Sequence, residues 1–97
     1  TEPWRVILHK AADLIEQRGH CKGALEDRHG ALCMGGAVNV ADTGRSGASG
    51  AIKRSEPGIE AIKRLHAFCP PFFTMYNNAP NRTAAEAVAK LRECAES

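Results

Sequence analysis

The feature that most constrains the fold is an apolar repeat near the start of the chain with the period of an α-helix. Apolar side chains recur three or four positions apart from Trp4 to Ile15, and polar side chains occupy the opposite face. Such a stripe is typical of an amphipathic helix that buries one side. Thr1 can cap this helix, Pro3 suits its first turn and Gly19 is a common terminator. The sequence therefore predicts a helix over residues 3–18.

A second strong helix signal lies near the other end of the chain. The segment "TAAE" has the pattern of a capping box, in which Thr83 caps the helix and Glu86 bonds back. One apolar face then follows at helical spacing, so we expect a helix over residues 83–95. Similar spacing predicts a helix over residues 57–68 and a short one near residues 37–43, which Gly44 would end.

The segment "HCKGALEDRHGALCMGGAVNVAD", residues 20–42, predicts a different element. Two short, mostly apolar runs flank a polar turn that ends in Gly30, which can adopt the positive φ that hairpin loops require. Two strands alone are marginal, so a hairpin here must pack on helices. The predicted fold class is therefore α+β, mostly helical, with three to four helices packed around a small two-stranded β-hairpin.

The predicted organisation is one small globular domain over residues 1–97, because this length is near the commonest domain size. Residues 44–58 are rich in glycine and serine and indicate a flexible loop. Residues 72–82, "FFTMYNNAPNR", indicate an ordered loop instead. Its large apolar side chains favour burial: Phe72, Phe73, Met75 and Tyr76.

Bulk properties exclude several classes of protein. The net charge of +2 is far below that of a dedicated nucleic-acid binder, and no apolar run has the length of a membrane span. Asp13 and Glu16 interrupt the first apolar stretch, which is not typical of a signal peptide. The four cysteines include no C-x-x-C pair, so we expect a cytoplasmic protein with free, mostly buried thiols. A disulfide framework is the alternative.

Several short motifs together resemble an uncharacterised family of small actinobacterial and actinophage proteins, a domain of unknown function. In that family a helix leads to G-W-C-x-G-A, a D-x-x-G turn and C-x-x-G-A-L, and the close reads W-N-D-x-P-G-R-T. This chain has "HCKGAL", "DRHG", "CMGGAV" and "YNNAPNRT" at the corresponding places. The resemblance covers nearly the whole chain except residues 44–58. It implies an actinobacterial or phage origin and carries no established activity.

The chain departs from that pattern at three positions. His20 replaces the usual aromatic residue, and Asn78 replaces the usual aspartate. Gly36 is an additional glycine, which we expect to add flexibility before Ala37. If the family aspartate has a charged role, Asn78 puts that role in doubt in this chain.

Cys33 is the candidate nucleophile of an enzyme. It directly precedes a predicted helix, where backbone amides and the helix dipole would lower the pKa of its thiol. His20 is a candidate base, and Asn77 or Asn78 a candidate orienting group. The alternative interpretation is that Cys21 and Cys33 are small buried apolar residues, which is the commoner role of free cysteine.

A zinc site is the next interpretation of the same segment. Its ligands would be His20, Cys21 and Cys33, with His29 or Cys69 as the fourth. Structural zinc sites usually draw on closely paired ligands such as C-x₂₋₄-C, which this chain lacks. We therefore predict no metal and no cofactor.

Weak nucleic-acid binding is an interpretation of the basic middle of the chain. Glu56 and Glu60 dilute the positive field, and a solvated helix face is the alternative. The basic residues are Arg45, Lys53, Arg54, Lys63 and Arg64.

The segment "MYNNAPNRT" is the candidate binding surface. Asn77 and Asn78 are typical turn formers, and Arg82 can pair with a carboxylate such as Glu26 or Asp27. These contacts would either tie the loop to the predicted hairpin or form a small polar surface for recognition.

Because no complete catalytic set is present, the leading hypothesis is a small, non-enzymatic protein-interaction module. Its resemblance suggests a phage or prophage accessory protein that acts on a host protein. The alternatives are a cysteine-dependent enzyme centred on Cys33 and a weak nucleic-acid-binding protein. The sequence identifies neither the partner nor the oligomeric state.

Overall fold

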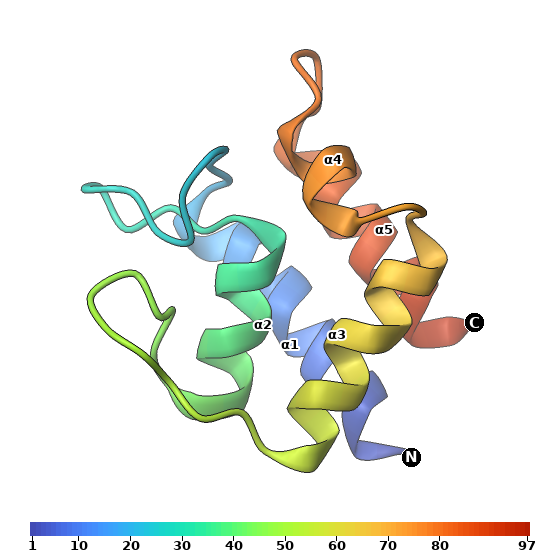
Figure 1. The fold of residues 1–97 in the computed structure, drawn as a ribbon. Coiled ribbons are helices and arrows are strands. Elements are labelled where there is room, and N and C mark those ends of the chain that lie inside the picture. Colours follow the sequence, from blue (N-terminus) through green and yellow to red (C-terminus); the bar gives the residue numbers. More distant parts are fainter.

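The computed structural model describes residues 1–97 as five α-helices (Figure 1). Their bounds are Pro3–Arg18 for α1, Met34–Thr43 for α2, Glu56–Phe68 for α3, Phe73–Asn78 for α4 and Ala84–Glu96 for α5. The helices predicted over 3–18, 57–68 and 83–95 are thus confirmed within one residue. None of the five has the combination of length and hydrophobicity that a bilayer span needs.

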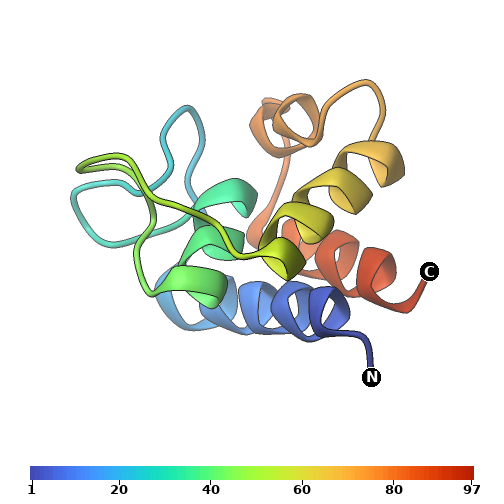
Figure 2. The ribbon, with the colours of Figure 1, turned by 60° about the horizontal axis from the view of Figure 1, so that its bottom comes forward.

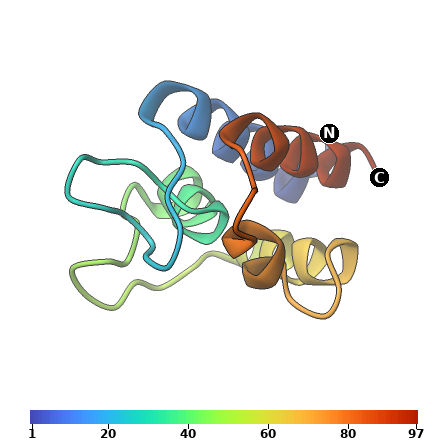
Figure 3. The same cartoon turned by 90° about the horizontal axis from the view of Figure 1, so that it is seen from above.

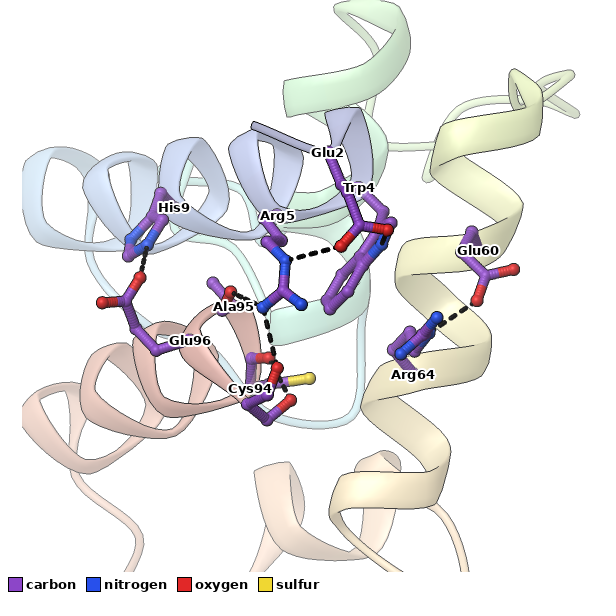
Figure 4. A network of polar contacts seen from close by, with 10 residues as sticks. Glu2, Trp4, Arg5, His9, Glu60, Arg64, Cys94, Ala95 and Glu96 are labelled. Atoms are coloured by element: carbon purple, nitrogen blue, oxygen red, sulfur yellow. Dashed lines mark hydrogen bonds and ion pairs between the residues drawn. The ribbon is translucent and has the colours of Figure 1, made fainter.

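Helices α1 and α5 form an antiparallel pair along one side of the molecule (Figure 2). At one end, Arg5 donates from Nη1 to the carbonyl oxygens of Ala95 (2.8 Å) and Ser97 (2.7 Å) (Figure 4). A cation there complements the negative end of the α5 dipole. Toward the other end, Arg92 Nη2 lies 2.7 Å from a carboxylate oxygen of both Asp13 and Glu16. Arginine contacts with residues 76 to 92 positions away therefore join the two ends of the chain.

Trp4 connects this pair to α3 (Figure 4). Only 4% of the residue is exposed, and the guanidinium carbons of Arg5 and Arg64 lie 4.4 and 4.5 Å from the ring centroid. Cations at this distance from an indole ring are attracted by its quadrupole. The indole Nε1 donates to Glu2, so the polar tip of the ring is satisfied as well.

The main core lies between α1, α2, α3 and α5. Apolar burial is the chief favourable term in folding, and the apolar stripe of α1 supplies a large part of it here. The largest completely buried apolar side chains are Leu8, Ile15, Leu32, Met34, Leu65, Leu91 and Val38.

The prediction of a β-hairpin, and with it of an α+β fold, is wrong because the chain is all-helical. Residues 19–33 form an irregular loop with only two isolated bridges, His20–Leu32 and Glu26–Leu32. Leu32 pairs on both sides and the chain bends at residues 22–25, so no continuous ladder forms. The tight turn at Gly30 is confirmed, with φ at +86°.

The glycine- and serine-rich connection is shorter than predicted, because α3 already begins at Glu56. Asn39, a buried side chain of α2, holds both ends of this connection. Its amide nitrogen donates to the Ser46 carbonyl at 2.8 Å, and its amide oxygen accepts from Arg54 Nε at 2.8 Å. The connection runs beside the loop of residues 19–33 (Figure 3), and Leu25 lies against Gly47.

Residues 73–78, predicted as part of a loop, form the short helix α4. Its helical geometry turns Phe73 and Asn77, four positions apart, toward the interior. The neighbouring side chains Phe72 and Met75 face outward and are 56% and 61% exposed. The prediction that all four large side chains of this segment are buried is therefore wrong for these two.

Candidate functional site

A small hollow separates α4 from the loop of residues 19–33, and we call it the α4 pocket. Its volume is about 260 Å³. It brings together Cys33 and Asn77, which the sequence singled out separately. Its lining consists of Gly23, Ala24, Leu25, Cys33, Phe73, Thr74, Asn77 and Asn78.

Asn77 is the organising residue of the pocket and is only 2% exposed. Its Oδ1 accepts from the Met34 backbone at 2.9 Å and lies 2.7 Å from His20 Nε2. Its Nδ2 donates to the Cys21 carbonyl at 3.2 Å and to Asn78 Oδ1 at 2.9 Å. An amide has two donor hydrogens and two acceptor lone pairs. All four are used, so Asn77 ties α4 to the loop and to α2.

This network also fixes the proton on His20. Because Asn77 Oδ1 already accepts from Met34, its contact with His20 Nε2 requires that nitrogen to donate. The candidate base therefore bonds to the candidate orienting group, as the sequence suggested. No hydrogen bond joins His20 to Cys33, whose Sγ accepts from Gly36 N at 3.2 Å.

Cys33 is the N-cap residue of α2 and lies at the edge of the α4 pocket. Burial raises the pKa of its thiol, and hydrogen bonds from the Gly36 and Gly35 backbone amides offset only part of that rise. The expectation of a lowered pKa is therefore wrong, because the loss of hydration outweighs the helix N-terminus. At neutral pH the group is a protonated thiol that caps a helix.

Cys21 belongs with Cys33 to a small buried cluster that also contains Ala31 and is flanked by Leu25. Burial is the main cause that raises the pKa of the Cys21 thiol. All four cysteines are free and buried, as expected. No group of three potential ligands has the geometry of a metal site, so His20, Cys21, Cys33, His29 and Cys69 do not converge.

Two glycines in the first turn of α2 allow the loop and α4 to approach it closely. A β-carbon at Gly36 would overlap the carbonyl group of Leu25, and one at Gly35 would lie 3.1 Å from Phe73 Cζ. Gly36 is buried in the helix and permits contact with the loop. The structure thus gives this glycine a packing role in place of the flexibility expected from the sequence.

The predicted partners of Arg82 are engaged elsewhere. Glu26 pairs with Arg18 at 2.8 Å, and the carboxylate of Asp27 accepts from the backbone of His29 and Ala31. Those backbone bonds, that of Ala31 first, lower the pKa of Asp27. Glu26 and Asp27 therefore shape the turn.

Arg82 itself anchors the end of α4. Its Nε donates to the Tyr76 carbonyl at 2.8 Å, and its guanidinium carbon lies 3.5 Å from the centroid of the Tyr76 ring. Its Nη1 lies 3.6 Å from a carboxylate oxygen of Glu86, on the next helix. Asn78 accepts from Gly23 N at 3.1 Å, a bond that an aspartate could also accept.

The basic residues of the middle segment do not act as one group. Arg54 donates to Asn39, and Arg64 pairs with Glu60 and stacks on Trp4. The other three, Arg45, Lys53 and Lys63, are exposed and make no ion pair. They extend from the loop after α2 to the middle of α3.

Sequence reasoning missed the exposed apolar pair Phe72 and Met75 on the segment that lines the α4 pocket with Phe73 and Thr74. Phe72 packs edge-on against the His66 ring at 5.8 Å between centroids, and the inward Phe73 lies 4.6 Å from the same ring. The available signal was spacing: Phe72 and Met75 are three positions apart, whereas Phe73 and Asn77 are four apart. A helix with these two pairs presents them on different faces.

Comparison with known proteins supplies the family. The model of a family of unknown function, DUF6197, matches residues 1–97. The chain belongs to the DUF6197 family. Neither the curated proteins nor the solved structures gave a match. The fold and pocket described above therefore give a structural description of one DUF6197 chain, in which the two cysteine motifs and the "YNNAPNRT" segment meet around Asn77.

Proposed function

We propose that this protein is a non-enzymatic interaction module that binds another protein through the α4 edge. We define the α4 edge as Phe72, Met75 and the α4 pocket. The observation that carries the proposal is the exposure of Phe72 and Met75, at 56% and 61%, on the segment whose residues Phe73 and Thr74 line the pocket. Exposed large apolar side chains that adjoin a pocket are typical of protein-binding surfaces.

The size of the pocket supports a protein partner. Sites for drug-sized ligands and cofactors usually enclose about 300–1,000 Å³. The α4 pocket, at about 260 Å³, lies below that range and suits a single side chain. A groove between α1 and α5 is larger, at about 590 Å³, and its edge is occupied by the ion pair of Glu16 with Arg92.

The hydrogen bonds of Asn77 and the protonation state of Cys33 argue against catalysis at this site. Asn77 has no free hydrogen-bonding position, and the thiol of Cys33 is protonated and caps α2. A nucleophilic cysteine requires a thiolate at working pH. We extend the proposal, on the family resemblance, to a phage or prophage accessory protein that acts on a host protein inside an actinobacterial cell.

Site-specific photo-crosslinking tests the proposal. A photoreactive phenylalanine analogue is placed at Met75 in one sample and at Ile59, which is also exposed (49%), in the control. In an actinobacterial lysate we expect one protein to be crosslinked from position 75 only, and Phe72→Ser to abolish that product. The protein recovered is then purified and its Kd for the unmodified chain is measured. Equal crosslinking from both positions, or a product that survives Phe72→Ser, would contradict the proposal.

The state of Cys33 provides a test against the enzyme alternative. We expect iodoacetamide to alkylate Cys33 more slowly in the native protein than in urea at pH 7, since burial and a raised pKa both reduce the reactive thiolate. The native rate should continue to rise with pH above 9.0, the usual value for the thiol. Peptide mass spectrometry measures each cysteine separately. Alkylation faster than in urea would support a catalytic thiol.

A further inference from the structure

We infer that the partner presents an acidic segment carrying one large apolar side chain, and that this side chain enters the α4 pocket. The inference rests on the proposed function and specifies the chemistry of the partner. It is based on the volume of the pocket and on the charged side chains of the neighbouring segments.

The apolar part of the inference follows from the pocket. Its volume of about 260 Å³ suits one aromatic or long aliphatic side chain, and the side chains of Leu25, Cys33 and Phe73 provide apolar contacts. Phe72 and Met75 are exposed and are the sequence neighbours of Phe73 and Thr74, which line the pocket. Interfaces commonly have this anatomy, with a single anchor in a pocket surrounded by weaker contacts.

The acidic part follows from the charges around α4. Between Glu60 and Glu86 the chain has three cations, Lys63, Arg64 and Arg82, and no carboxylate. Lys63 is exposed, makes no ion pair and lies one turn before His66, whose ring contacts Phe72. Lys22, beside Gly23 of the pocket, bonds through Nζ only to the Pro80 carbonyl at 3.0 Å. Two lysines without an ion pair thus lie on the segments next to α4: Lys22 on the loop that lines the pocket and Lys63 on α3.

The carboxylates on the segments that follow Leu25 and α4 already have partners. Glu26 pairs with Arg18, and Asp27 accepts from backbone amides of its own turn. Glu86 accepts from the Thr83 backbone, and its pKa is lowered mainly by that bond. The unpaired charges at the α4 edge are therefore positive. Electrostatic complementarity then favours carboxylates next to the anchor of the partner.

Asn78 adds a polar contact at the mouth of the pocket. Its Oδ1 is occupied by Gly23 N and Asn77 Nδ2, whereas its own amide nitrogen makes no hydrogen bond within the chain. That nitrogen is a free donor next to the anchor position. It suits a backbone carbonyl or a carboxylate of the partner segment.

Selection from a random dodecapeptide display library tests the inference with the folded full chain as bait. We expect the enriched peptides to share one large apolar residue flanked by Asp or Glu. Ala24→Trp, which fills the pocket from an exposed position, should raise the Kd of these peptides at least about tenfold. Thr74→Trp is a second plug from the opposite wall, in case the first variant fails to fold.

Charge variants test the acidic component. The double substitution Lys22→Glu with Lys63→Glu should raise the Kd about tenfold or more at low salt, and added salt should weaken binding to the unmodified chain. The matched control, Lys10→Glu, reverses one charge at an exposed position on α1 outside the α4 pocket lining and is compared with each single lysine substitution at physiological salt. It should leave the Kd within about twofold, because exposed charges more than about 8 Å apart are largely screened at that salt.

The outcomes separate this inference from the proposed function. The decisive peptides are those that bind the unmodified chain and lose binding to the Phe72→Ser, Met75→Ser variant. If these peptides are not enriched in Asp or Glu, or if their Kd is unchanged by the lysine substitutions, the inference is overturned and the proposed interaction surface is retained. Failure to enrich any peptide that depends on the pocket would also overturn it. The crosslinking experiment decides the proposed function independently.

Discussion

The α1–α5 pair and the α4 edge are held together in different ways. The pair buries apolar side chains such as Leu8 and Leu91 completely, and polar contacts of Arg92 and Arg5 join its two ends. The α4 edge depends on the hydrogen bonds of one side chain, Asn77, and leaves Phe72 largely exposed. Stability thus resides mainly in the pair, and the surface available for binding lies where the chain is joined by fewer buried contacts.

The difference shows how a small protein can combine a well-packed core at the α1–α5 pair with an exposed binding surface at the α4 edge. The core buries apolar area from many side chains, so substitutions on the outer face of α4 should leave the core intact. A local network around one amide holds the loop and α4 in register. Substitutions in the α1–α5 pair should therefore lower the free energy of unfolding, whereas substitutions at the α4 edge should mainly change local hydrogen exchange or binding.

The largest expected effect is on the α1–α5 pair. Leu8→Ala should lower the free energy of unfolding by about 3 kcal/mol, because a completely buried leucine leaves a cavity. Val6→Ala on the same helix, where the side chain is 44% exposed, should cost less than about 1 kcal/mol. Urea unfolding followed by circular dichroism measures both. Similar losses for the two variants would contradict the assignment of the buried face.

Asn77→Ala should cost about 2 kcal/mol, because the Met34 N–H and the Cys21 carbonyl then lack a buried partner. Hydrogen exchange should show faster exchange at Met34 and unchanged exchange at Leu91 in α5, since the opening is local. The control Asn78→Ala affects an exposed residue and should cost less than about 1 kcal/mol. If exchange accelerates equally at Leu91, the two regions are not energetically separate.

Thr83→Ala should lower the free energy of unfolding by about 1 kcal/mol, because Thr83 Oγ1 no longer accepts the capping hydrogen bond from Glu86 N at the start of α5. Thr1→Ala is the matched control. The sequence offered Thr1 as a cap of α1, but the N-cap is Glu2, and no side chain makes a capping hydrogen bond there. A measurable cost for Thr1→Ala in thermal unfolding would contradict this difference.

The smallest effect on stability should come from the α4 edge. The double substitution Phe72→Ser with Met75→Ser should change the free energy of unfolding by less than about 0.5 kcal/mol, since both side chains are mostly exposed. The same variant should lose the crosslinked partner. A stability loss comparable to that of Leu8→Ala would show that these side chains belong to the core.

The sequence predicted the long helices because their signals are local. The stripe of α1 and the capping box at Thr83 specify a helix without reference to the rest of the chain. The burial of Cys21 and Cys33 was also predictable, since free cysteine is among the most buried residue types.

The loop and α4 were not predictable because non-local contacts decide them. Leu32 pairs with segments on both sides, and the carbonyl of Leu25 accepts from Cys33 N. The pattern of apolar and polar residues in the sequence does not distinguish such a loop from a hairpin. Asn77 was recognised as a turn former, but its role depends on His20 and Met34, which are 57 and 43 positions away. The raised pKa of Cys33 likewise depends on burial, which the position before a helix does not reveal.

The bonds from Arg5 to the last turn of α5 have a practical consequence. They bring both ends of the chain to the side of the molecule opposite α4, as Figures 1 and 2 show. A tether or fluorophore attached at either end therefore leaves the same surface accessible. Immobilisation through one end and then the other should give the same binding curve, which makes the orientation of the molecule on a sensor chip a controllable variable.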